Sequence, residues 1–161
     1  MTVTQAAVGA ARRVPPLGGF SPGIVRLEVR RLLRNRRTLI FTMIAPVIFF
    51  LIFGLNSSYA TQRSGLGNVS ATVLISMALY GAVLATTSGG AMVSIERALG
   101  WSRQLRVTPL LPSAYIAVKV LSSLVLGLGS VGVVYVVGSL TQKPSMPAYV
   151  WVVTALCVWI G

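Results

Sequence analysis

Long apolar runs alternate with short polar segments along the chain. Predominantly apolar stretches cover about residues 38–55, 69–95 and 115–140; the first two carry no charge and the third carries one, Lys119. Each approaches or exceeds the roughly 20 residues that a helix needs to cross the hydrocarbon core of a bilayer. A fourth apolar run, 149–161, has only thirteen residues, so the sequence as given is expected to stop inside a membrane segment. The pattern predicts an all-α fold, a polytopic membrane helix bundle.

The residues before the first apolar run divide into two parts. Residues 1–23 are rich in small residues, Pro and Gly, and are expected to form a flexible cytosolic tail ahead of a membrane domain that covers 24–161. From Ile24 to Arg37, apolar residues recur at helical spacing and most Arg side chains fall on the other side. This predicts an N-terminal amphipathic helix. It could lie on the membrane as an interfacial helix, with Arg30, Arg34 and Arg37 at the membrane interface, or serve only as a charge cluster that orients the next helix.

Three features inside the apolar runs affect the helices themselves. Pro46 removes one backbone donor, which predicts a kink in the first span rather than its end. Gly81, Ala85 and Gly89 recur every four residues, a spacing that permits close helix contact, although Gly and Ala are common in membrane helices in any case. Gly89 and Gly90 together could loosen or end the second helix before the polar segment that follows.

Composition excludes several classes of site. The chain has no His, one Cys (Cys157) and only two acids, Glu28 and Glu96, so it lacks the groups for a Ser-His-Asp triad, a zinc site or a paired-carboxylate glycosidase. It also lacks the GxxxxGK[ST] pattern of a phosphate-binding loop. We therefore expect no catalytic, cofactor-binding or metal-ligating residue, and no enzyme.

Basic residues gather on one side of the predicted membrane. The net charge is +12, and eight of the fourteen Lys and Arg lie before residue 38, whereas the loops at 56–68 and 141–148 hold one each. The positive-inside rule places the N-terminus and the segment 96–112 in the cytosol. Lys119, one turn inside the third span, is expected to snorkel to the interface. An Arg-rich helix joined to a membrane span is explained more simply by lipid than by nucleic acid.

The polar segment between the second and third spans reads SIERALGWSRQLRVTPL, residues 94–110. On a helical wheel, Ile95, Leu99 and Leu105 lie on one face and charged residues lie mainly on the other. This predicts a short helix parallel to the membrane that ends at Thr108, because Pro109 disfavours the helical conformation in the residue before it. A connecting loop that merely rests on the membrane is the alternative.

The same segment resembles the signature of type 2 ATP-binding-cassette (ABC) exporter permeases, especially the branch similar to daunorubicin-resistance drug exporters. The matching positions are Glu96, Arg97, Gly100, Leu105, Thr108, Pro109, Leu110 and Lys119. The resemblance implies a cytosolic coupling helix that docks into a separate ATP-binding subunit and moves the membrane helices when ATP binds. The residues that would carry this coupling are Glu96, Arg97, Gly100, Trp101, Arg103, Leu105, Thr108 and Pro109. Glu96 and Arg97 could cap that helix, pair with charges of the partner, or both.

The resemblance also implies six membrane helices per subunit, a permease dimer in the lipid bilayer, a bacterial plasma-membrane location and efflux of a drug-like substrate. Only three spans and part of a fourth are present here. Two other functions stay open: a small proton-coupled multidrug exporter and a non-transporting membrane scaffold or anchor. The first needs an ionisable group at membrane depth, and the predicted spans contain none apart from Lys119 near an end. The cargo could be a drug, a lipid or a glycan precursor.

Overall fold

Three long apolar helices form the bundle in the computed structural model, which describes residues 19–100 and 111–161. The first span, Arg36–Gly54, consists of α2 (Arg36–Leu39), the π-helical turn η3 (Ile40–Ile44) and α3 (Ala45–Gly54). The other two are α5 (Val69–Ala98) and α7 (Pro112–Thr141). All three are long and apolar enough to cross a membrane. The described residues therefore confirm an all-α, polytopic helix bundle.

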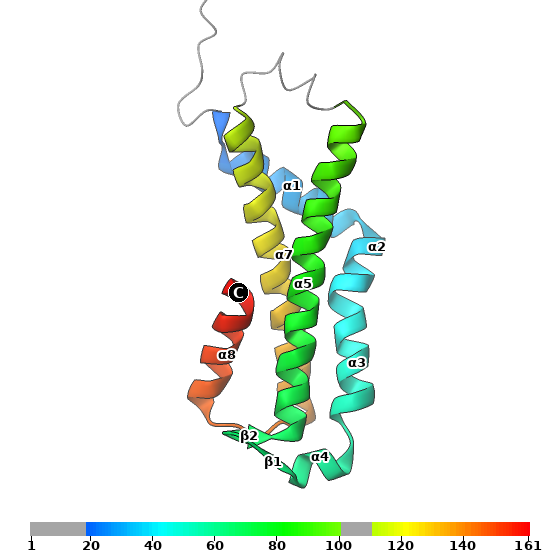
Figure 1. Cartoon of the computed structure of the whole chain (residues 1–161), viewed down its shortest axis with the longest axis vertical. Coiled ribbons are helices and arrows are strands. Elements are labelled where there is room, and N and C mark those ends of the chain that lie inside the picture. The colour runs from blue at the N-terminus through cyan, green and yellow to red at the C-terminus, as the bar shows by residue number, and fades with distance from the viewer. Residues whose placement is uncertain (1–18, 101–110) are drawn as a thin grey trace, which may run out of the picture.

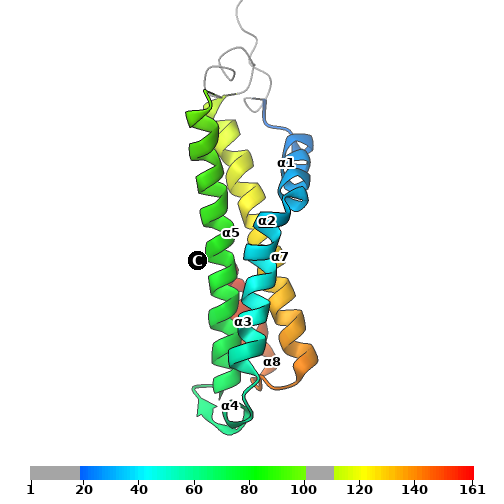
Figure 2. The same cartoon turned by 90° about the vertical axis from the view of Figure 1, so that its right-hand side faces the viewer.

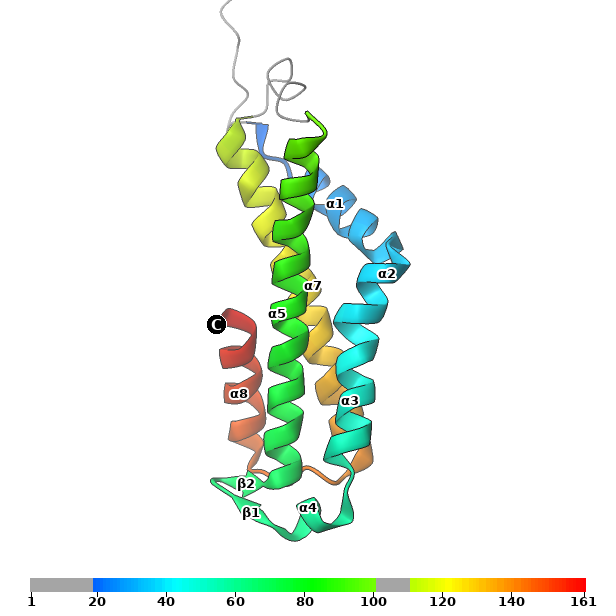
Figure 3. The same cartoon turned by 45° about the vertical axis from the view of Figure 1, so that its right-hand side comes forward.

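The shorter elements lie around these spans. α5 and α7 run side by side, with α3 on one side and α8 (Ala148–Ile160) on the other (Figure 1). At one end of the bundle lie α4 (Ser57–Thr61) and a small hairpin of β1 (Arg63–Ser64) and β2 (Gly67–Asn68). Toward the other end, α1 (Pro22–Arg34) packs on α7 at an angle to the long helices (Figures 2 and 3).

The predicted amphipathic helix has different bounds in the structure. It begins at Pro22, where the Ser21 side chain caps the helix, and it ends at Arg34 rather than at Arg37. The reason is Asn35, whose extended backbone interrupts the helix and whose side chain accepts the Thr38 amide at 3.4 Å to start α2. Arg36 and Arg37 therefore open the first span.

The expectation that Gly89 and Gly90 end the second helix was wrong, because α5 continues through both to Ala98. Tertiary packing explains this: Gly89 is buried against α7, and a Cβ there would lie 1.9 Å from Ser123 Oγ. Gly81 and Ala85 are buried on the same helix, and Ala85 faces Gly127 of α7. The small-residue spacing predicted for close helix contact is confirmed as the α5–α7 interface.

Pro46 affects the bundle through the Thr42 carbonyl, to which it cannot donate a backbone hydrogen bond. Proline has no N–H to donate to the carbonyl four residues earlier, which is that of Thr42. Here the chain widens into the π-helical turn just before Pro46, and the hydroxyl of Ser130 on α7 donates to the Thr42 carbonyl. Thr42 and Ser130 are 1% and 0% exposed. The span continues through Pro46, as predicted, and the Thr42 carbonyl joins it to α7.

Asn68 joins three segments at the hairpin end of the bundle. Its side-chain nitrogen donates to the carbonyls of Lys143 (2.7 Å) and Ala60 (3.2 Å), and its side-chain oxygen accepts the amides of Ala71 (2.9 Å) and Ser145 (3.0 Å). The Asn68 side chain is buried, and its bond to the Ala71 amide is buried with it, whereas the other three bonds are partly buried. One side chain therefore caps α5 and fixes the segment before α8.

We expect Asn68→Ala to lower the free energy of unfolding by about 1–3 kcal/mol, because buried backbone groups lose their partners. The measurement is unfolding of the purified protein in mixed micelles. Asn56→Ala is the matched control, since Asn56 is exposed and caps only the short α4. Equal losses from the two variants would contradict the role assigned to Asn68.

Candidate functional site

Both acids of the chain meet in one cluster at the α1 end of the bundle. Glu28 comes from α1 and Glu96 from the last turn of α5. Arg31 of α1 and Tyr115 and Lys119 of α7 lie against them. These five residues are called the charge cluster below. They tie together three helices that are far apart in the sequence.

Lys119 lies at the centre of the charge cluster. Its Nζ is 2.5 Å from Glu28 Oε1 and 2.8 Å from Glu96 Oε1. Arg31 Nη1 donates to the same Glu96 oxygen at 2.8 Å, and the Tyr115 hydroxyl donates to the other Glu96 oxygen. Glu96 thus accepts hydrogen bonds from α1 and from two residues of α7.

The balance of charge explains why these groups can be buried. Two carboxylates face one ammonium and one guanidinium, so the charge cluster is formally neutral, and burial of a charge is tolerated when it is paired and hydrogen-bonded. Glu96 is 7% exposed and Lys119 is 8% exposed. The Arg31 side chain is 56% exposed and forms the open edge, and its hydrogen bond to Glu96 raises the pKa of Arg31.

Helical spacing aligns the members of the charge cluster. Glu28 and Arg31 are three residues apart on α1, and Tyr115 and Lys119 are four apart on α7, so each pair shares a helix face. Leu32 is buried on α1 one turn after Glu28, which shows that this face packs against the bundle. Glu28, Arg31 and Tyr115 were not among the site residues predicted from the sequence. The signal for Glu28 was that only two acids stand among fourteen bases.

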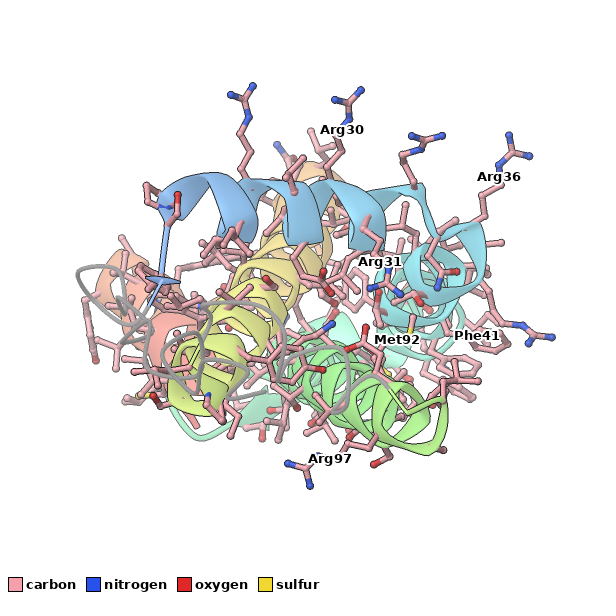
Figure 4. The ribbon with its side chains drawn as sticks, turned by 90° about the horizontal axis from the view of Figure 1, so that it is seen from above. Arg30, Arg31, Arg36, Phe41, Met92 and Arg97 are labelled. Atoms are coloured by element: carbon pink, nitrogen blue, oxygen red, sulfur yellow. The ribbon has the colours of Figure 1, made fainter. Side chains whose placement is uncertain are left out.

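The structure separates two residues that are neighbours in the sequence. Glu96 is buried in the charge cluster, whereas Arg97 is exposed and points to the opposite side of the bundle from α1 (Figure 4). Both belong to the last turn of α5 and do not begin a separate helix, which corrects the predicted end of the second span at residue 95. Gly100 then turns the chain out of α5 with a φ of +76°, a left-handed conformation that favours glycine.

The other predicted site residues fall into two groups. Trp101, Arg103, Leu105, Thr108 and Pro109 lie outside the described residues. Arg30, Arg34 and Arg37 are exposed, and Arg30 points away from the bundle, as does Arg36 (Figure 4). Lys119 was expected to snorkel to the interface, but in the structure two carboxylates hold its ammonium in the charge cluster.

The charge cluster lies where segment 94–110, which carries the sequence signature, connects α5 to α7. Glu96 lies in the last turn of α5, which ends at Ala98, and Tyr115 lies in the first turn of α7, which begins at Pro112. The Tyr115 hydroxyl binds Glu96 directly, so the two ends of the segment are joined to each other. The segment is therefore anchored at both ends in the same group of side chains.

Comparison with known proteins finds similarity to a transport permease. The chain is 26% identical over 138 residues to "Putative transport permease YvfS" of Bacillus subtilis (strain 168), a match that covers 83% of this chain and 54% of the relative. No family model matches the chain, and no solved structure matches it.

The permease similarity fits the fold. Three helices of membrane length, together with a permease relative, support a multi-pass membrane protein. The chain spans about half the length of that relative.

Proposed function

We propose that the chain is a membrane-spanning permease subunit of an ABC exporter. It would move a hydrophobic or amphipathic, drug-like substrate out of a bacterial cell, with its N-terminus in the cytosol and a second permease subunit beside it. ATP hydrolysis would occur in a separate ATP-binding subunit. The observation that carries this proposal is the anchoring of the signature-bearing segment, through Glu96 and Tyr115, in a cluster shared by three helices.

Coupling requires that movement of a partner subunit reach the membrane helices. Closure of a partner around ATP can act on those helices only through an element whose displacement biases them. A segment attached to α5 alone would move one helix. Here Lys119 binds Glu28 of α1 and Glu96 of α5, so a displacement at the base of the segment acts on α1, α5 and α7 together.

Glu96 and Arg97 take different parts in this proposal. Glu96 is paired within the chain, which makes it a positioning residue for the base of the segment. Arg97 is exposed, so its guanidinium is available to a carboxylate of the ATP-binding subunit. Arg97 is therefore the better probe of coupling, because its replacement leaves the charge cluster intact.

We expect Arg97→Glu to lower substrate-stimulated ATP hydrolysis by about 5- to 100-fold, the range of a typical coupling energy between two sites. The measurement is ATP hydrolysis by the permease reconstituted with its ATP-binding subunit, with and without a hydrophobic drug. Arg63→Glu is the matched control, since Arg63 is exposed in the hairpin at the other end of the bundle.

Full stimulation in the Arg97→Glu complex would remove the coupling role from this residue. ATP hydrolysis that does not respond to substrate in the unaltered complex would favour an anchor over a transporter. A normal amount of Arg97→Glu protein in the membrane shows that a loss of stimulation is not a loss of folding.

A further inference from the structure

A groove of about 390 Å³ lies between α5 and α7, on the side of the bundle to which Arg97 points (Figure 4). It follows α5 from Thr86 to Arg97 and α7 from Ile116 to Leu124. Its remaining lining residues are Gly89, Gly90, Val93, Lys119, Val120 and Ser123. Gly90 leaves open space in the groove, since a Cβ there would meet nothing within 4 Å, whereas Gly89 packs closely against Ser123 of α7.

The groove is apolar along its length and cationic at one end. The hydroxyls of Thr86 and Ser123 donate to carbonyls of their own helices, those of Ala82 and Lys119. The ammonium of Lys119 is neutralised by the two carboxylates of the charge cluster. Arg97 forms no ion pair within the described part of the chain, so it supplies the charge at the end of the groove.

The length of the groove matches one leaflet of a bilayer. The twelve residues from Thr86 to Arg97 span about 16 Å of helix, which is about half of the ~30 Å hydrocarbon core. At the far end from Arg97, the Trp159 indole of α8 donates to the Leu124 carbonyl at 3.0 Å. α8 thus covers the adjoining part of α7, and the groove occupies the half of the span nearest α1.

We propose that this groove binds an anionic phospholipid of the leaflet on the α1 side, the cytosolic leaflet in the orientation proposed above. An acyl chain lies between α5 and α7, and the lipid phosphate pairs with Arg97. Such a site recognises both parts of an anionic lipid: the apolar groove holds the acyl chain, and the cation at the level of the head groups pairs with the phosphate. The inference goes beyond the proposed function and needs only that the bundle spans a membrane.

The test is native mass spectrometry of the purified chain titrated with phosphatidylglycerol or with phosphatidylcholine. We expect phosphatidylglycerol to bind about fivefold more tightly, which corresponds to about 1 kcal/mol for one basic residue at the head group. Arg97→Gln should remove this preference while leaving the acyl contribution in place.

Two glycine variants separate the groove from the rest of the lipid-facing surface. A Cβ at Gly90 meets nothing within 4 Å, so Gly90→Leu can place its side chain in the groove without a clash at its Cβ. We expect it to weaken binding of both lipids about tenfold, on the scale of about 25 cal/mol for each Å² of apolar surface that the acyl chain no longer buries. Gly132→Leu is the control, because Gly132 is equally open but lies outside the groove.

Three results would overturn the proposal. They are equal binding of the two lipids by the unaltered chain, equal effects of Gly90→Leu and Gly132→Leu, and loss of a dimer in Gly90→Leu, which would make the groove a helix-docking surface. Arg97 has a part in both proposals, so Gly90→Leu, which keeps Arg97, is the variant that tests lipid binding alone. Coupling is measured as ATP hydrolysis and not as lipid binding.

Discussion

Lys119→Met is expected to lower the free energy of unfolding by about 3–5 kcal/mol, the usual cost of removing one partner from a buried ion pair. The substitution keeps an apolar stem of similar length and removes the ammonium that both Glu28 and Glu96 share. Only the exposed Arg31 then faces two carboxylates. The measurement is equilibrium unfolding in mixed micelles, followed by tryptophan fluorescence.

A double variant tests whether the loss of charge balance causes the expected destabilisation by Lys119→Met. Glu96→Gln combined with Lys119→Met leaves one acid and one base in the charge cluster, so it should be more stable than the sum of the single losses predicts by about 1 kcal/mol or more. Arg97→Gln is the control one residue away, with an expected change within about 0.5 kcal/mol because its side chain is exposed. Strictly additive losses would contradict the shared pairing.

Gly81→Ala is expected to destabilise the bundle by about 1–3 kcal/mol, although alanine is the better helix former. A Cβ at Gly81 would lie 2.2 Å from Ser130 Oγ, 3.0 Å from Pro46 Cγ and 3.2 Å from the Thr42 carbonyl oxygen. The methyl group would therefore force apart the first span, α5 and α7 where they meet. The measurement is the fraction of protein that stays monodisperse after heating in detergent.

The matched control for Gly81 lies on the same helix. Gly90 has open space at its Cβ, so Gly90→Ala should leave stability unchanged or raise it by up to about 1 kcal/mol through helix propensity alone. If Gly81→Ala and Gly90→Ala changed the stability in the same direction, helix propensity would explain both results. The close contact at Gly81 would then have no measurable effect on stability.

The spans could be predicted from the sequence because membrane length and absence of charge are local properties. The predicted 38–55, 69–95 and 115–140 correspond to helices at Arg36–Gly54, Val69–Ala98 and Pro112–Thr141. The ends were less predictable, because Asn35 caps one helix while ending another, and α5 continues through Gly89, which packs against α7. Those features depend on neighbours that the local pattern does not specify.

The candidate site was only partly predictable for a related reason. The signature identified Glu96, Arg97 and Lys119, but it did not show that Glu96 faces inward while Arg97 faces outward. Glu28 was not a candidate, because its partner Lys119 is 91 residues away in the sequence. A pairing at that separation depends on how α1 packs across α7. A helical wheel of either segment alone does not show that packing.

The hydrogen bond from Ser130 to the Thr42 carbonyl holds α7 against the first span at one point, about which α7 could tilt. Ser130 lies eleven residues from Lys119 and eleven from Thr141, so it divides this part of the helix into two arms of about 16 Å each. A tilt of about 10° around that point would move each end by about 3 Å, in opposite directions. A displacement at the charge cluster would then reach the far surface of the membrane with its size unchanged and its direction reversed.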